Sequence, residues 1–402
     1  MTVNIKKSTA SGTVFAPPSK SISHRALICA SLTDNSNVFN IAFSKDITAT
    51  LNCLEKLGAK VKKDGDSLSV GKLNPFEIAD NTVIFCNESG STLRFLIPLC
   101  MLSGKKIILK GSKRLFERPL TVYEDICKNN GIVFKKGTDC LTVCGKLKAN
   151  EYNVAGDISS QFVSGLLFAL PLLNKDSKIN ITGNLESASY IDLTLKILND
   201  FGINIKKDNN AFTVFGNQTY KSTNITVEGD CSNAAFLDAF NLFGGNVKVE
   251  GLNGDSIQGD RVYIRMFNDL KSGKKEFDLT DCPDLAPIMF AVSPSFGGAV
   301  FYGTKRLKIK ESDRISAMAS ELKKFGVTVT ENENSVEISD GNLKKPQEIL
   351  YGHNDHRIVM ALSVLCSVTS GSISGAQAVE KSYPDFFEKI SQLGIGTYYE
   401  ET

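Results

Sequence analysis

Residues 88–102 read ESGSTLRFLIPLCML, a polar turn followed by an apolar run long enough for a helix of about a dozen residues. The pattern occurs five more times, as SKSISHRALICASL (19–32), ISSQFVSGLLFALPLL (158–173), CSNAAFLDAFNLF (231–243), PDLAPIMFAV (283–292) and NDHRIVMALSVLCSV (354–368). Each copy continues through a Gly-rich or Asn/Ser loop into a short β-like run. An internal repeat therefore organises the chain.

The repeat is about 70 residues long. Its equivalent positions, which are Ser21, Ser89, Ser159, Ser232, Asp284 and Asp355, are separated by 68, 70, 73, 52 and 71 residues. The fourth copy is therefore expected to be shortened.

The second half of the unit also repeats. A helix is expected to stop at Gly58, Gly131, Gly202, Gly326 and Gly394, because glycine is the usual residue at a helix C-terminus. After the first four stops, two alternating strands follow around a polar turn, at residues 61–70, 133–145, 203–216 and 327–339. The unit is thus βαβαββ, and six units form two sets of three in an α/β architecture; an all-α array is excluded.

The boundary between the two sets carries no Pro/Ser-rich linker. We expect the chain to cross near residues 226–229, which predicts one domain of residues 17–226 and a second of residues 1–16 plus 227–402, with the active site in the interdomain cleft. A crossing of only a few residues would let the halves hinge.

Composition excludes several classes of protein. The 402 residues are 42% hydrophobic, and 46 Lys+Arg against 44 Asp+Glu give a net charge of +2, so a nucleic-acid or membrane-surface binder is not expected. No apolar run approaches the ~18 residues of a membrane span and no signal-peptide core is present, so we expect a cytoplasmic protein. The ten cysteines form no CxxC pair and there are three histidines, so reduced cysteines and no metal site are expected. There is also no P-loop, no dinucleotide-binding GxGxxG and no Ser-His-Asp set.

Arginine is scarce in the chain and gathers at the repeat helices. Only nine are present, and Arg25, Arg94, Arg314 and Arg357 lie within the first turns of predicted helices, while Arg118 precedes Pro119 at another helix start. A helix N-terminus offers unpaired N–H donors and a partial positive charge. With Ser hydroxyls and Lys20 nearby, these starts are predicted to bind phosphates and carboxylates; solvated or acid-paired arginines are the alternative.

The segment KESDRI places Glu311 between two cations, Lys310 and Arg314. Such neighbours lower a carboxylate pKa and desolvation raises it, so this group could act as an acid or a base. The alternative is a helix cap formed by Ser312 or Glu311. Capping is likewise an alternative for Asp284, for Asp355 and for the row of neutral donors at residues 159–161.

Eight motifs taken together closely resemble the 5-enolpyruvylshikimate-3-phosphate (EPSP) synthase family: PPSKSISHRAL, NESGSTLRFL, ERP at 117–119, GDISSQF, PDLAP, KESDRI, NDHR and KSYPDFF. They occur in order from about residue 16 to residue 387. The resemblance implies an enolpyruvyl-transferase-like inverted α/β barrel fold, two domains each of three βαβαββ units around a pseudo-threefold axis, in agreement with the repeats counted above.

The activity implied by the resemblance is transfer of the enolpyruvyl group of phosphoenolpyruvate to the 5-hydroxyl of shikimate 3-phosphate, releasing phosphate. This is a step of the shikimate pathway of aromatic amino acid biosynthesis and the target of glyphosate. No cofactor or metal is implied, and the expected partners are the two anionic substrates, bound by a monomer.

The resemblance also implies site residues. Those for shikimate 3-phosphate are Lys20, Ser21, Arg25, Ser159, Ser160, Gln161, Ser187, Tyr190, Asp284 and Lys310, and those for phosphoenolpyruvate are Lys20, Gly90, Arg118, Gln161, Arg314, Arg357 and Lys381. The implied chemistry is addition followed by elimination: Asp284 or Glu311 takes the 5-hydroxyl proton, Lys20 or Glu311 protonates the methylene carbon, and a tetrahedral ketal loses phosphate.

Two positions depart from the family's pattern. Arg306 stands where some members place a substrate-contacting Asn, so that role is not carried over, and ESGST replaces NAGTA around Gly90, in the expected phosphoenolpyruvate pocket. UDP-N-acetylglucosamine enolpyruvyl transferases share the fold, but their loop carries a reactive Cys or Asp that GSKRLFERP at 111–119 lacks. A non-catalytic module for anionic sugars is the alternative from another class, and the acid/base candidates Asp284 and Glu311 argue against it.

Overall fold

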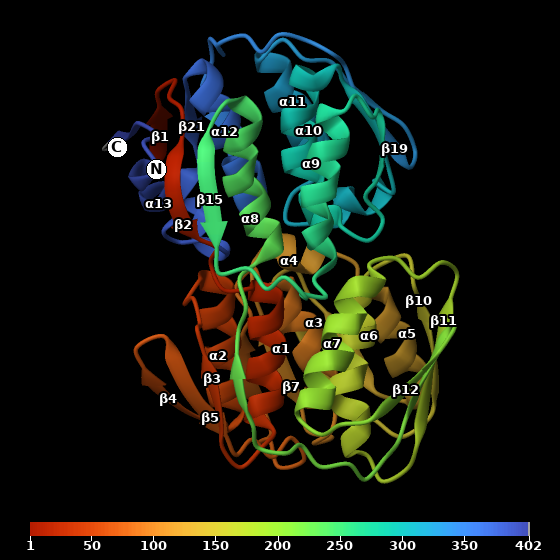
Figure 1. The fold of residues 1–402 in the computed structure, drawn as a ribbon. Helices are drawn as coiled ribbons and strands as arrows, with labels where there is room; N and C mark the ends of the chain where they lie inside the picture. The colour runs from red at the N-terminus through yellow and green to blue at the C-terminus, as the bar shows by residue number, and fades with distance from the viewer. Residues whose placement is uncertain (401–402) are drawn as a thin grey trace. The chain divides into compact units, whose positions relative to one another are not determined.

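The computed structural model describes residues 1–400 as two compact units (Figure 1). Residues Pro18–Glu228 form the inserted unit, and Met1–Pro17 with Gly229–Thr402 form the discontinuous unit. The inserted unit leaves the other after β2 (Ser11–Phe15) and returns before α8 (Cys231–Asp238). Both crossings lie within two residues of the division expected from the repeats.

The inserted unit contains three sheets of identical topology. In each, the first two strands are parallel and the remaining neighbours are antiparallel. The strand orders are β14 (Asn224–Thr226), β3 (Ser36–Phe39), β5 (Ser67–Gly71), β4 (Lys60–Asp64); β6 (Thr82–Phe85), β7 (Ile107–Lys110), β9 (Cys140–Cys144), β8 (Val133–Lys136); and β10 (Glu151–Ala155), β11 (Ser177–Thr182), β13 (Ala211–Val214), β12 (Ile205–Asp208).

The helices of this unit lie between its sheets (Figure 1). The first helices of the three repeats are α1 (Lys20–Ser31), α3 (Gly90–Cys100) and α6 (Ser160–Ala169), and nearly all of their residues are buried. Burial on nearly every face places these three helices in the core of the unit. The second helices are α2 (Lys45–Leu57), α5 (Thr121–Asn130), preceded by the short α4 (Lys113–Glu117), and α7 (Ala188–Asp200).

The discontinuous unit repeats this plan. One sheet has the order β16 (Glu276–Asp278), β17 (Ala299–Tyr302), β19 (Ser335–Ile338), β18 (Val329–Glu331), and another the order β20 (Leu350–Tyr351), β21 (Gly371–Ser374), β1 (Thr2–Ile5), β22 (Thr397–Glu400). The third pairs only β15 (Asn246–Glu250) with β2. Its helices are α8, α9 (Tyr263–Lys271), α10 (Ala286–Val292), α11 (Arg314–Lys324), α12 (His356–Thr369) and α13 (Phe386–Gln392), with 3-10 turns η1 to η7 across both units.

The sheet topology confirms six repeats, four hairpins and a shortened fourth copy. That copy has only the two-stranded β15–β2 sheet, since its hairpin is absent, which accounts for the 52-residue spacing. The inverted-barrel expectation is met by separate sheets around central helices: within residues 1–400 all six sheets are open. They remain open because each packs one face on central helices rather than curling upon itself.

Each unit has its own hydrophobic core, and seven of the ten cysteines belong to these cores. All ten are free, eight are buried, and Cys140 and Cys144 are half-buried on β9. Among residues 1–400 no helix is long and apolar enough to cross a membrane.

Candidate active site

Arg314 is the centre of the ionic network in the discontinuous unit. It is the first residue of α11, its side chain is 1% exposed, and three carboxylates surround its guanidinium. Its Nε donates to Asp355 at 2.9 Å, its Nη1 to Asp284 at 2.8 Å and its Nη2 to Glu311 at 3.0 Å. The local cause is the cap of α11, where Asp313 accepts from the backbone N–H groups of residues 315 and 316 and turns the KESDR segment toward the cluster.

Asp284 joins this arginine to a second one. Nη2 of Arg357, the second residue of α12, donates to Oδ2 of Asp284 at 2.9 Å and to Oγ of Ser232 at 3.0 Å. Nζ of Lys310 lies 4.0 Å from Oδ1 of the same carboxylate. The starts of α8, α10, α11 and α12 therefore meet at one ionic network.

The electrostatics of the network follow from its burial and its charges. Burial alone raises the pKa of Asp284, but Arg357, Lys310 and Arg314 outweigh it and hold that pKa well below its usual value. Burial lowers the pKa of Lys310 to about 8, with Arg306 and Arg314 adding to the effect against the opposing pull of Asp284. The cluster thus contains an ionised carboxylate beside a lysine that changes charge near neutral pH.

The capping alternatives separate in the structure. Asp355 does cap α12, accepting from the backbone N–H of Arg357 at 3.0 Å. For Asp284 capping is wrong, because Cys282 and Leu285 occupy the cap positions of the 3-10 turn η4 (Pro283–Leu285) and of α10. The carboxylate of Asp284 instead accepts from the side chains of Arg314 and Arg357. For Ser312 and Glu311 it is wrong as well, because Asp313 takes the cap position and Glu311 pairs with Arg314.

Lys381 enters the cluster from the 3-10 turn η7 (Ala376–Lys381). Its side chain is largely buried, and its Nζ donates to the backbone carbonyl of Asn354, directly before Asp355. Arg306, the departure from the family's pattern, is buried and donates from Nη2 to the carbonyl of Thr280 at 2.7 Å. Its charge reaches the site through its effect on Lys310.

In the inserted unit, Lys20 and Arg25 lie on α1 and bind residues in the first turns of α2 and α7. Nζ of Lys20 pairs with Asp46, in the first turn of α2, at 2.9 Å. Arg25 is buried and donates to the carbonyls of Ser21 (2.7 Å) and Tyr190 (2.9 Å) and to Oγ1 of Thr194 (2.8 Å). Burial lowers the pKa of Arg25 to about 10. The start of α1 is thereby joined to the start of α7.

Gly90 and Arg118 touch at the start of α3. A Cβ built on Gly90 would lie 2.6 Å from Nη1 of Arg118 and 3.0 Å from its Cζ. Beside them, Nη1 of Arg94 donates to Oε1 of Gln161 at 2.8 Å, and Nε2 of Gln161 donates to Oγ of Ser91 at 2.9 Å. Gln161, the second residue of α6, is therefore oriented by α3 with both ends of its amide engaged.

The candidate serines lie at two further helix starts. Ser159 caps α6 by accepting from the backbone N–H of Gln161 at 3.3 Å, and Ser160 is the first residue of that helix. Ser187 is buried before α7 with a φ of +57°, a left-handed conformation that is uncommon for a residue with a side chain. Both segments thus hold donors at helix N-termini.

Polar contacts connect the helices of the inserted unit in a closed circuit. Arg25–Thr194 links α1 to α7 and Thr194–Ser164 (2.7 Å) links α7 to α6. The Gln161–Arg94 bond links α6 to α3. The Thr92–Thr50 bond (2.6 Å) links α3 to α2, and the Thr50–His24 bond (2.8 Å) links α2 to α1. Two candidate residues of this unit, Arg25 and Gln161, therefore lie on one connected framework of helices.

The structure brings the candidates into two clusters, one in each unit. Residues that the sequence interpretation did not assign also belong to them, namely Asp46, Arg94, Thr194, Ser232 and Asp355. The sequence does point to Ser232 and Asp355, which occupy equivalent positions of the repeat. It also points to Arg94, which is one of only nine arginines and lies at a helix start. Nothing in the sequence marks Asp46 or Thr194 as a site residue. Asp46 contacts Lys20 and Thr194 contacts Arg25 only through tertiary structure.

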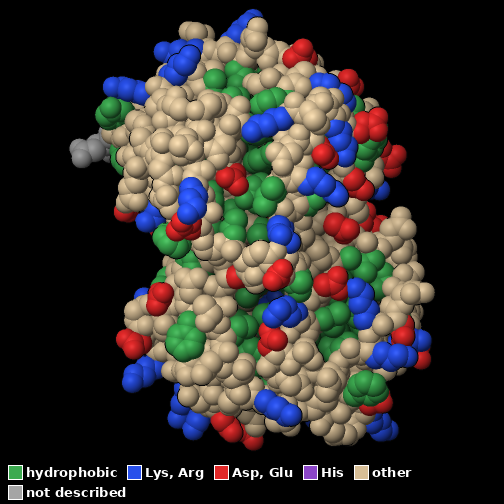
Figure 2. Space-filling model, viewed as in Figure 1, with side chains coloured by type: hydrophobic (Ala, Val, Ile, Leu, Met, Phe, Trp, Pro, Cys, Tyr) green, Lys and Arg blue, Asp and Glu red, His purple; other side chains and the backbone are tan. Residues whose placement is uncertain are grey.

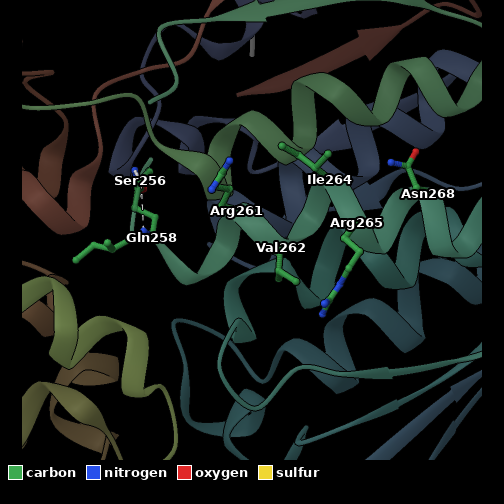
Figure 3. A pocket seen from close by; sticks show the side chains of 8 residues that line it. Ser256, Gln258, Arg261, Val262, Ile264, Arg265 and Asn268 are labelled. Atoms are coloured by element: carbon green, nitrogen blue, oxygen red, sulfur yellow. Dashed lines mark hydrogen bonds between the residues drawn. The ribbon is translucent and has the colours of Figure 1, made fainter. Parts of the chain in front are cut away.

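A groove of about 570 Å³ lies elsewhere on the discontinuous unit (Figure 3). It is lined by eight residues at and before α9, which are Ser256, Ile257, Gln258, Arg261, Val262, Ile264, Arg265 and Asn268. None of the candidate residues lines it. On the face seen in Figure 2, basic and acidic side chains are interspersed over both units.

Two solved structures have the same fold along the entire chain. An EPSP synthase from Acinetobacter baumannii aligns with a TM-score of 0.79 and 22% identity, covering 100% of both chains. The enolpyruvyl transferase NikO from Streptomyces tendae aligns with a TM-score of 0.76 and 13% identity, covering 99% of this chain and 98% of NikO. The fold is that of the enolpyruvyl transferases.

Sequence comparison narrows the class to a family. The model of the EPSP synthase (3-phosphoshikimate 1-carboxyvinyltransferase) family matches residues 5–390. A 3-phosphoshikimate 1-carboxyvinyltransferase from Clostridium kluyveri is 43% identical over 421 aligned residues, covering 98% of this chain and 97% of the relative. The chain belongs to the EPSP synthase family, which confirms the resemblance seen in the eight motifs.

Proposed function

We propose that the chain transfers the enolpyruvyl group of phosphoenolpyruvate to the 5-hydroxyl of shikimate 3-phosphate and releases phosphate, in the shikimate pathway. One observation carries the site assignment: in a member of this family, Asp284 and Glu311 sit against Lys310, Arg314 and Arg357 in a single network. Cations suited to a phosphate and a carboxylate lie beside two groups able to move protons.

The two clusters are proposed to be the two halves of one active site. Neither alone contains the whole set of cations that two phosphates and a carboxylate require. Shikimate 3-phosphate would be held mainly by the inserted unit, through Lys20, Ser21, Arg25, Ser159, Ser160, Gln161, Ser187 and Tyr190, with Asp284 and Lys310 supplied by the other unit. Phosphoenolpyruvate would contact Lys20, Gly90, Arg118 and Gln161 of one unit and Arg314, Arg357 and Lys381 of the other.

Asp284 is the proposed acceptor of the 5-hydroxyl proton. Its low pKa keeps it ionised at neutral pH, but the same cations make it a weak base while the site is empty. The carboxylate and phosphate of phosphoenolpyruvate would compete for Arg314 and Arg357, and loss of those bonds raises the basicity of Asp284. Binding of phosphoenolpyruvate thereby activates the base.

The reaction then proceeds by addition and elimination. The 5-oxygen forms a bond to the central carbon of phosphoenolpyruvate while Lys20 or Glu311 delivers a proton to the methylene carbon. In the second step the new methyl group loses a proton, the bond from the central carbon to the phosphate oxygen breaks, and phosphate leaves. Surrounding cations stabilise the charge on the leaving group. No electrons are gained or lost overall, so the chemistry requires no redox cofactor.

A phosphate-release assay tests the function. Phosphoenolpyruvate is offered with shikimate 3-phosphate or with UDP-N-acetylglucosamine as acceptor, and release is expected only with the former. Release only with the UDP-sugar would identify the related transferase activity, and anion binding without release would identify a non-catalytic binding module. Asp284→Asn serves as the matched inactive variant, since it keeps the side chain's size and loses its charge.

A further inference from the structure

A carboxylate outside the proposed site has an unusually complete set of partners. Glu321 lies in α11, two turns after Arg314, and its side chain is 2% exposed. Its Oε1 is 2.9 Å from Nε2 of His353 and accepts from Oγ of Ser320 at 3.2 Å. Its Oε2 accepts from Nζ of Lys324 at 2.8 Å and from the backbone N–H of Tyr351 at 3.0 Å. A buried charge with this many bonds is held in one geometry.

The partners of Glu321 include the turn between β20 and α12. In this turn His353 has a φ of +49° and Asn354 a φ of +51°, two consecutive left-handed residues that each carry a side chain. Such residues cost energy and persist only where surrounding contacts determine them. The bonds from Glu321 to Tyr351 and His353 are contacts of that kind, at the near end of the turn.

The far end of the same turn forms part of the proposed site. The carbonyl of Asn354 accepts from Nζ of Lys381, and Asp355 accepts from Nε of Arg314 at 2.9 Å. Two of the cations assigned to phosphoenolpyruvate, Lys381 and Arg314, are thus held by consecutive residues of a strained turn. If the turn relaxes, both of their anchors move together.

We infer that Glu321 is a positioning residue for phosphoenolpyruvate. Through His353 and the N–H of Tyr351 it holds the turn at 351–355, so that Asn354 and Asp355 keep Lys381 and Arg314 in place. The inference rests on the proposed function, which assigns those two cations to phosphoenolpyruvate. The carboxylate of Glu321 itself touches no proposed substrate residue, because its two oxygens are engaged by α11 and the turn.

The decisive variants are Glu321→Gln and a pair at His353. His353 is part-exposed, so His353→Ala leaves the core intact while removing the bond to Glu321. His353→Gln restores a donor at nearly the position of Nε2 and is the rescue variant. Asp238→Asn is the control, because it alters a largely buried carboxylate of the same unit, bonded to Tyr263 at 2.6 Å, away from this turn.

Steady-state kinetics with each substrate varied is the first measurement. Glu321→Gln and His353→Ala are expected to raise KM for phosphoenolpyruvate by about tenfold, with KM for shikimate 3-phosphate and kcat within about twofold of wild type. His353→Gln should return KM for phosphoenolpyruvate to near wild type, and Asp238→Asn should leave it unchanged. An unchanged KM in His353→Ala, or an equal rise in Asp238→Asn, overturns the inference, and His353→Ala decides it even where Glu321→Gln does not fold.

Binding of inorganic phosphate, measured by calorimetry, separates this inference from the proposed function. If the wild-type chain releases no phosphate from its substrates, the proposed function fails, yet the variants can still be compared by their Kd for phosphate. The inference then predicts a Kd raised about tenfold in Glu321→Gln and His353→Ala and restored in His353→Gln. Equal values of Kd in wild type and in both weakened variants overturn it.

Discussion

The substitution Gly90→Ala tests the phosphoenolpyruvate pocket at a single methyl group. Gly90 begins α3 with an ordinary helical backbone, so no left-handed conformation makes glycine obligatory there. A Cβ would instead lie 2.6 Å from Nη1 of Arg118 and 3.1 Å from Nη2. The space at Gly90 is therefore occupied by a guanidinium, which must move for alanine to fit.

The magnitude follows from those distances. An ordinary contact of 3.4–4 Å requires the guanidinium to withdraw by about 1 Å, and misplacing a positioning group that far can cost up to ~10²-fold in activity. We expect KM for phosphoenolpyruvate to rise about 10- to 100-fold, and glyphosate inhibition to weaken more. The free energy of unfolding should change by no more than about 1 kcal/mol, because alanine favours the helix by about 1 kcal/mol and offsets the cost of moving Arg118.

Two other glycines provide matched controls for the kinetics and the thermal unfolding. Gly165 lies within α6, where a Cβ would be 2.5 Å from the backbone carbonyl of Arg94, so Gly165→Ala should lower stability by about 1–3 kcal/mol. Gly341 has no atom within 4 Å of an added Cβ, so Gly341→Ala should leave both properties unchanged. The reasoning is refuted if Gly90→Ala unfolds as Gly165→Ala does, or if its KM and glyphosate sensitivity match those of Gly341→Ala.

Three further predictions concern catalysis, charge and domain motion. Glu311→Gln should retain a hydrogen bond to Arg314 but lower turnover by ~10²–10⁴, and near-normal turnover with a raised KM would make Glu311 a binding residue only. Lys310, with a pKa of about 8, loses its positive charge as the pH rises through that value, so KM for shikimate 3-phosphate should increase between pH 7 and 9. Lys310→Arg stays charged and should flatten this profile; an identical profile in the variant would assign the pH dependence to another group. Adding shikimate 3-phosphate with a phosphoenolpyruvate mimic should reduce the radius of gyration in solution scattering, because bound anions offset the mutual repulsion of the cations in the two clusters, and an unchanged radius would contradict hinge closure.

Much of the fold could be predicted because its signals are local. Apolar runs after polar turns predicted the core helices, and the glycine stops and Asn/Asp/Gly turns predicted the four hairpins. Gly58 and Gly131 do end their helices in the left-handed conformation that only glycine adopts easily. The short spacing of the fourth copy, 52 residues, likewise predicted a shortened unit, and the structure shows that the missing element is its hairpin.

The roles of the charged residues in the candidate site could not be predicted from local sequence patterns. Asp284 and Asp355 occupy equivalent positions of the repeat, and the pattern indicated a cap for either. Asp355 caps its helix while also binding Arg314, whereas Asp284 binds Arg314 and Arg357 from within a 3-10 turn, outside the cap positions of η4 and α10. The role of each carboxylate depends on arginines up to 73 residues away in the chain, which no local pattern contains.

The sequence by itself determined the repeat and the helix starts, because both follow from short-range backbone and side-chain preferences, and it showed that the few arginines gather at those starts. Tertiary structure alone decided which partner each charged group finds: Asp46 for Lys20, Thr194 for Arg25, Arg118 against Gly90, and the Glu321 contacts that hold a distant turn. Those pairings arise when separate repeats pack around shared cores. The pKa values of Asp284 and Lys310 arise with them, since burial and neighbouring charge exist only in the folded chain.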